Sequence, residues 1–116
     1  MSKTDSPKPI LALIEEYNDV IGKQFISRTR VVSAAYILDL SNKQSRLIKD
    51  FNKALEGADA DLDDAVSNML VASVDVLDPL CIGTDNIKAA LTRYVQAYRA
   101  AKRAAVGVAS MQEATA

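Results

Sequence analysis

The stretch that decides the fold reads TDNIKAALTRYVQAYRAAKRAA and runs from Thr84 to Ala105. Its larger apolar side chains recur every three or four residues, and that spacing places them on one face of an α-helix. They are Ile87, Leu91, Tyr94, Val95, Tyr98, Ala101 and Ala105. Two different edges flank this face: a basic edge of Lys88, Arg99, Lys102 and Arg103, and an alanine edge of Ala90, Ala97, Ala101 and Ala104. We therefore expect this helix to be the packing centre of a helical bundle.

Length and composition agree with a small helical domain. The chain has 116 residues, a usual size for one domain. Its hydrophobic content is 49% and its charged content 25%, both typical of globular proteins. Glycine, proline and aromatic residues are too few for a turn-rich β-sandwich. We expect an all-α fold, a compact bundle of four to five helices with short loops.

Apolar periodicity predicts helices near residues 8–24, 28–40, 42–56, 61–78 and 85–106. Ser6 followed by Pro7 is typical of a helix start, so residues 1–7 are expected to form a short polar arm. The single domain then covers residues 8–106, and Gly107 begins a polar tail, 107–116. Because Gly22 weakens a helix without ending it, the first two helices could also be one bent helix.

The segment VVSAAYILDL, from Val31 to Leu40, is apolar nearly all round. Periodicity alone does not separate a buried helix from a buried strand in such a short run. Its neighbours all have helical patterns, so we predict a buried helix. Ser41 and Gln44 then match a capping box, in which the serine caps a helix and the glutamine reaches back to it. This match predicts that a new helix begins at residue 42.

One expected core follows from these helices. Its members are Leu13, Ile14, Tyr17, Ile21, Leu38, Leu47, Phe51, Val66, Met69, Leu77, Leu91 and Tyr94. The aspartates that precede Leu62 suit a helix N-terminus, where carboxylates complement the helix dipole. They do not form a calcium loop, because the twelfth position counted from Asp59 is Leu70 and not a glutamate.

The sequence offers little material for catalysis. It contains no histidine and one cysteine, Cys81, so neither the usual general base nor a zinc site is available. It also lacks a glycine-rich phosphate loop and a nucleophile elbow. Cys81, between Leu80 and Ile82, fits a small buried hydrophobe better than a reactive thiol. We expect a protein that is not an enzyme and needs no cofactor or metal.

Two features bear on location. An unpaired cysteine favours a reducing compartment, and MSKTDSPKP lacks the apolar core of a secretory signal. No apolar run approaches the ~18 residues of a membrane span. We therefore expect a soluble, cytoplasmic protein without membrane insertion.

Charge is distributed unevenly along the chain. Residues 57–86 contain seven acids and no base, whereas residues 87–116 contain five bases and one acid. Such segregation is typical of elements that face each other, within one chain or between copies. The leading hypothesis is a self-associating subunit of a larger assembly that acts by protein–protein interaction. Its candidate surface joins Lys88, Ala97, Arg99, Lys102, Arg103 and Ala104 on the basic helix to Asp64, Asp75 and Asp78 in the acidic segment.

Two alternatives stay open at this point. The basic edge could contact nucleic-acid phosphates, joined by Lys23, Arg28 and Arg30, as part of an accessory subunit. The protein could instead be a small regulatory or inhibitory protein that binds a foreign target, and nothing in the sequence separates that role from self-association.

Overall fold

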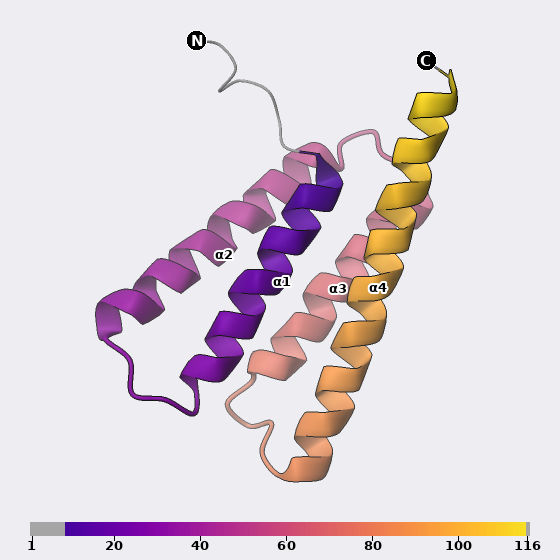
Figure 1. Cartoon of the computed structure of the whole chain (residues 1–116). Coiled ribbons are helices and arrows are strands. Elements are labelled where there is room, and N and C mark those ends of the chain that lie inside the picture. Colours follow the sequence, from indigo (N-terminus) through magenta and orange to yellow (C-terminus); the bar gives the residue numbers. More distant parts are fainter. Residues whose placement is uncertain (1–8, 116) are drawn as a thin grey trace.

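The computed structural model describes the backbone of residues 9–115 and the side chains of residues 9–108. Within this range the chain forms four helices and no strand, which confirms the all-α prediction. The helices are α1 (Ile10–Ser27), α2 (Ala34–Ala54), α3 (Ala60–Leu77) and α4 (Thr84–Thr115), and they run alternately down and up (Figure 1). The connections between them, residues 28–33, 55–59 and 78–83, are short.

Helix α1 lies at the centre of the bundle. It packs against α2 on one side and against α3 and α4 on the other, and α3 and α4 pack along each other. Helix α2 therefore flanks the bundle and touches only α1 (Figure 1). The Cα atoms extend over 48 × 35 × 17 Å, so the molecule is flat. This arrangement leaves the outer side of α2 without a covering helix.

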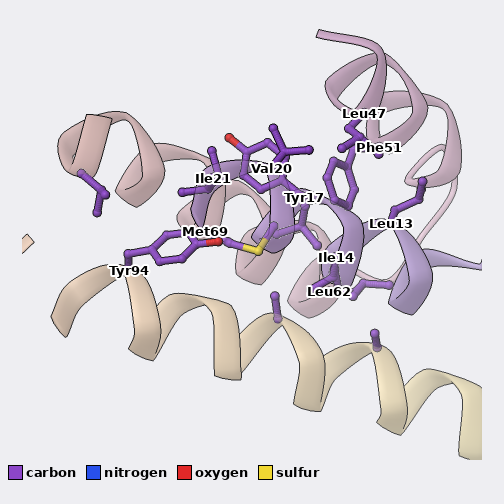
Figure 2. Close-up of a cluster of buried hydrophobic side chains, with 14 of the residues drawn as sticks. Leu13, Ile14, Tyr17, Val20, Ile21, Leu47, Phe51, Leu62, Met69 and Tyr94 are labelled. Carbon is purple, nitrogen blue, oxygen red and sulfur yellow. The ribbon is translucent and has the colours of Figure 1, made fainter. Parts of the chain in front are cut away.

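Most of the predicted core is buried. Nine of the twelve expected residues lie in it: Leu13, Ile14, Tyr17, Ile21, Leu47, Phe51, Val66, Met69 and Tyr94. The rings of Tyr17 and Phe51 meet edge to face, with centroids 5.8 Å apart, and join α1 to α2 (Figure 2). Leu77 and Leu91 are half-buried and pack against the same cluster. The prediction was wrong for Leu38, whose side chain is 61% exposed.

Polar groups cross the core beside these apolar residues. The Tyr17 hydroxyl lies 2.6 Å from Ser73 Oγ, and Ser73 is fully buried. Ser73 donates its proton to the Leu70 carbonyl over 2.6 Å, so Tyr17 is the donor to Ser73. Gln44 Nε2 in turn donates to the Tyr17 hydroxyl over 3.4 Å. This chain of bonds links α2, α1 and α3.

We expect Ser73→Ala to lower the free energy of unfolding by about 1–3 kcal/mol, because it leaves the Tyr17 hydroxyl without its acceptor. Adding Tyr17→Phe removes that stranded hydroxyl as well, so the double variant should lose less than the sum of the two single variants. Urea unfolding of the three variants measures this. If the loss of the double variant equals the sum of the two single losses, the hydrogen bond between Tyr17 and Ser73 is contradicted.

Helix α2 differs from the sequence prediction of two helices that meet at residue 41. It runs unbroken from Ala34 to Ala54, and its N-cap is Ser33, whose Oγ accepts a hydrogen bond from Tyr36 N over 3.1 Å. Residues 28–33 form the connection instead of a first helical turn. Leu40, Leu47 and Phe51 occupy one buried stripe across the supposed boundary, so side-chain burial keeps the helix continuous.

The same segment corrects a second prediction. Val31 to Leu40 was expected to form a buried helix, but only Leu40 in it is buried. Leu38 lies two residues, or about 200°, around α2 from Leu40, so it points away from α1. Because α2 has no neighbour other than α1, that side of the segment remains exposed.

Helix α4 also exceeds its predicted end. It continues through Gly107 to Thr115, because glycine costs a helix only about 1 kcal/mol relative to alanine and does not terminate it. Consequently α4 extends past the other helices at its C-terminal end (Figure 1). The predicted arm, 1–7, and the predicted helix start at Ser6 lie outside the described residues.

Candidate interaction surface

The end of the bundle that carries two of its connections is the most unusual surface of the molecule. The α1–α2 connection, 28–33, and the α3–α4 connection, 78–83, both lie at this end (Figure 1). Arg28 holds them together: its guanidinium donates to the Val76 carbonyl over 3.0 Å and to the Cys81 carbonyl over 3.4 Å. These bonds fix the end of α1 against the end of α3.

Large apolar side chains are exposed mainly at this end. Of eleven such side chains in the described part of the chain, seven belong to the two connections, to the last turn of α1 or to the first five residues of α2, and Val74 lies on the last turn of α3. We call these seven the apolar end: Ile26, Val31, Tyr36, Ile37, Leu38, Leu80 and Ile82. The most exposed of the α3–α4 members is Leu80, at 84%.

At the opposite end of the bundle, the described connection is covered. There the α2–α3 connection, 55–59, turns its apolar side chains inward, and both Leu55 and Ala58 pack against the core. The connection turns at Gly57, whose φ of +73° favours glycine. The α2–α3 connection thus packs its apolar side chains against the core, whereas the two connections of the apolar end expose theirs. Exposure of apolar side chains is therefore not common to all connections of this fold.

A groove opens between α1 and α2 at the apolar end. Its volume is about 460 Å³, and the side chains of Ile26, Val32 and Tyr36 provide its apolar lining. Two cations, Lys23 and Arg30, stand on its rim. Lys23 pairs with Asp19 over 2.9 Å, and this hydrogen bond raises the pKa of Lys23 above its ordinary value. Arg30 is exposed and makes no ion pair among the described residues, so it is the free charge of the groove.

The α3–α4 connection presents the other half of the apolar end. Asp78 Oδ1 accepts a hydrogen bond from Leu80 N over 2.9 Å, and Asn86 Nδ2 donates to the Ile82 carbonyl over 2.9 Å. Gly83 adopts a φ of +90°, which turns the chain into α4. The connection is therefore fixed at both ends while the side chains of Leu80 and Ile82 stay exposed.

The basic residues predicted on α4 are divided between two environments. Lys88, Arg99 and Arg103 are exposed and form no ion pair within the described part of the chain. Lys102 instead pairs with Glu15 of α1 over 3.6 Å, and its Nζ lies 5.4 Å from the centre of the Tyr98 ring. Lys102 therefore contributes to packing within the chain.

The alanine edge of α4 is used inside the molecule. Ala90, Ala101 and Ala105 are buried, and Ala97 and Ala104 are half-buried against the same core. The small side chains let α4 lie close to the neighbouring helices. An external apolar patch around Ala97 and Ala104, as the sequence suggested, is thus largely covered by the chain itself.

The acidic residues predicted in the surface lie on α3 and at its end. Asp64 and Asp75 are exposed, and Asp78 is half-buried with its carboxylate turned to the α3–α4 connection. Although α3 packs along α4, none of these three pairs with a base of α4 among the described residues. Among the described residues, the acidic and basic faces therefore do not neutralise each other.

The predicted phosphate cluster is not a free cationic surface. Lys23 is paired with Asp19, and Arg28 is occupied by two backbone carbonyls and lies 5.9 Å from the centre of the Phe25 ring. Of the three predicted residues, only Arg30 stays free of such contacts.

Other kinds of site find no support in the described residues. They contain no group of three His, Cys, Asp or Glu side chains that could hold a metal ion. None of their helices is both long and apolar enough to cross a membrane. Cys81 is half-buried, and its Sγ lies 3.6 Å from the Asn86 carbonyl. Burial raises the pKa of the Tyr94 hydroxyl, which donates to Asn18 Oδ1 over 2.9 Å and so remains a structural donor.

Comparison of the chain with protein-family models, with curated proteins and with solved structures found no match. In its described residues the chain is therefore an all-helical bundle that exposes large apolar side chains at one end.

Sequence reasoning missed the apolar end, although two signals for it were present. Val31 to Leu40 has more apolar side chains than one helical face can bury. Leu80 and Ile82 stand in a connection between Pro79 and Gly83, where polar residues are usual. The first segment was expected in the core, and the surroundings of Cys81 between Leu80 and Ile82 were expected to be buried.

Proposed function

We propose that this protein is a non-enzymatic helical-bundle protein that acts by protein–protein interaction, as a self-associating subunit of an assembly. The observation that carries the proposal is the apolar end. Exposed apolar side chains gathered on one part of a surface mark interaction sites, because water contact with them is unfavourable. The apolar side chains of the α2–α3 connection, at the other end of the bundle, are covered by the chain. Among the connections, exposure is therefore confined to those of the apolar end.

Charge on the long faces supports association between copies. Within the part of the chain that the structure describes, Asp64 and Asp75 on α3 form no ion pair, and neither do Lys88, Arg99 and Arg103 on α4, so each copy offers one acidic and one basic face. Exposed ion pairs contribute only about 0–1 kcal/mol each, so they orient copies more than they hold them. The apolar end is the surface that can supply most of the affinity.

Salt tests the electrostatic part of this proposal. At about 0.5 M salt the Debye length falls to a few ångströms, so the dissociation constant should rise relative to low salt without association being lost. Charge reversal by Arg99→Glu and Arg103→Glu together should weaken assembly at low salt and leave the helix content unchanged. Light scattering gives the mass, and circular dichroism gives the helix content.

The control is the salt response of this double variant. If its association is as salt-sensitive as that of the parent, Arg99 and Arg103 do not contribute. If the mass of the parent is the same at both salt concentrations, charge does not contribute to association. The apolar end would then be the surface that holds the copies together.

Contact with nucleic-acid phosphates is the second candidate function. It is favoured by Lys88, Arg99 and Arg103, which are exposed on one helix and pair with no acid of residues 9–108. Binding through them would be independent of sequence and would weaken linearly on a logarithmic salt scale. Titration of a fluorescent DNA duplex at 50 mM salt tests it. Binding that Arg99→Glu and Arg103→Glu abolish would make this function the better one, and no binding would exclude it.

A further inference from the structure

The two halves of the apolar end differ in form and in charge: one is a groove with the exposed cation Arg30, and the other is a connection with exposed apolar side chains beside aspartates. One half is the groove between α1 and α2, which is lined by Ile26, Val32 and Tyr36 and carries the cations Lys23 and Arg30. The other half is the α3–α4 connection, which exposes Leu80 and Ile82 and is flanked in the sequence by Asp78 and Asp85. No base lies between residues 57 and 86 in the sequence, although Arg28 and Arg93 lie beside this connection, so Asp85 is the exposed acid that we assign to the contact.

The α3–α4 connection cannot fill the groove of its own chain as the molecule is folded. Arg28 holds the α3–α4 connection beside α1 through the carbonyls of Val76 and Cys81, and the groove opens on the α2 side of α1. Neither Leu80 nor Ile82 is among the side chains that line the groove. The two halves are thus adjacent at one end but do not meet.

We propose that two copies associate end to end about a two-fold axis, with the α3–α4 connection of each copy inserted into the α1–α2 groove of the other. This inference rests on the proposed function and names the surface and the partner, a second copy of this chain. Because both halves lie at the same end, one rotation satisfies both contacts at once, so this contact closes between two copies and leaves the long faces of α3 and α4 free for weaker contacts between pairs. A complementary pair placed at opposite ends would instead build an open chain.

The groove is large enough for this contact. Its volume of about 460 Å³ is about three times the ~150 Å³ of a cavity that accommodates benzene, so it has room for aliphatic side chains. Leu80 is 84% and Ile82 66% exposed, so insertion would transfer much apolar surface out of water. Arg30 on the rim would face the aspartates of the partner, which fixes the direction of insertion.

A charge exchange between two variants tests the geometry. Arg30→Glu and Asp85→Lys each place like charges at both contacts of a homodimer, so each variant alone should dissociate at least about tenfold more readily than the parent. In an equimolar mixture, a heterodimer restores opposite charges at both contacts. The mixture should therefore recover a dissociation constant within about threefold of the parent. Sedimentation equilibrium at low salt measures all three samples.

Matched controls carry the same charge changes elsewhere. Lys49→Glu on α2 and Glu56→Lys in the α2–α3 connection are exposed and lie away from the apolar end, so neither should change association. Circular dichroism shows whether each variant keeps its helix content. Should Asp85→Lys lose helix content, Leu80→Ala replaces it, with a raised dissociation constant expected at an unchanged melting temperature.

The outcomes separate this inference from the proposed function. If the parent associates but the exchange variants do not weaken it, or their mixture does not recover, the reciprocal insertion is wrong and self-association through another surface stands. If the parent stays at the 12.5 kDa mass of one chain at every concentration, both are overturned and a foreign protein becomes the partner.

Discussion

Phe51→Ala should lower the free energy of unfolding by about 3–5 kcal/mol. Phe51 is completely buried, and its ring meets Tyr17 of α1 edge to face. Helix α2 packs on α1 alone, so no other helix can move in to fill the cavity that the ring leaves. Small domains are stable by about 5–15 kcal/mol in total, so the loss is a large part of the whole. Urea denaturation followed by circular dichroism measures it.

Leu38→Ala is the matched control on the same helix. Both residues are apolar and both were expected in the core, but Leu38 is 61% exposed and points away from α1. Its truncation should change the free energy of unfolding by no more than about 0.5 kcal/mol. Equal losses for the two variants would contradict the position of α2 as a flanking helix.

The combined variant Val31→Asp and Ile82→Asp should raise the dissociation constant of self-association at least about 30-fold. Burying an unpaired carboxylate in an apolar contact costs at least about 2 kcal/mol, and about 1.4 kcal/mol corresponds to a factor of ten. Val31 and Ile82 are exposed in the two connections of the apolar end, so burying a carboxylate there is costly. Sedimentation velocity over a concentration series gives the constants.

The control for this variant changes two exposed valines outside the apolar end. Val71 on α3 and Val106 on α4 are also exposed, so Val71→Asp and Val106→Asp alter charge and hydrophobicity equally. Their combination should leave the dissociation constant within about threefold. If the control disrupts association and Val31→Asp with Ile82→Asp does not, the interface lies on the long faces of α3 and α4.

The sequence predicted the helices and most of the core because both depend on local periodicity. Ile14, Tyr17 and Met69 recur at helical spacing and are buried as expected. Helix ends were harder to predict than helices. The capping-box match at Ser41 falls inside α2, because burial of Leu40 and Leu47 outweighs a local capping preference. Gly107 likewise lies inside α4.

The apolar end could not be predicted because it depends on which helix faces stay uncovered. An apolar segment such as Val31 to Leu40 has the same pattern whether its partner is in the chain or in another molecule. Its exposure follows from α2 touching α1 alone, which is a property of the packing. The alanine edge was expected to face another copy, but it packs largely within the chain. Small side chains suit close packing in both situations, so the sequence does not distinguish them.

Sedimentation equilibrium of the unmodified protein, from micromolar to millimolar concentration at low salt, tests most directly whether the apolar end joins two copies. We expect the mass to rise with concentration from the 12.5 kDa of one chain to at least twice that value. A mass that stays at 12.5 kDa throughout would contradict this expectation.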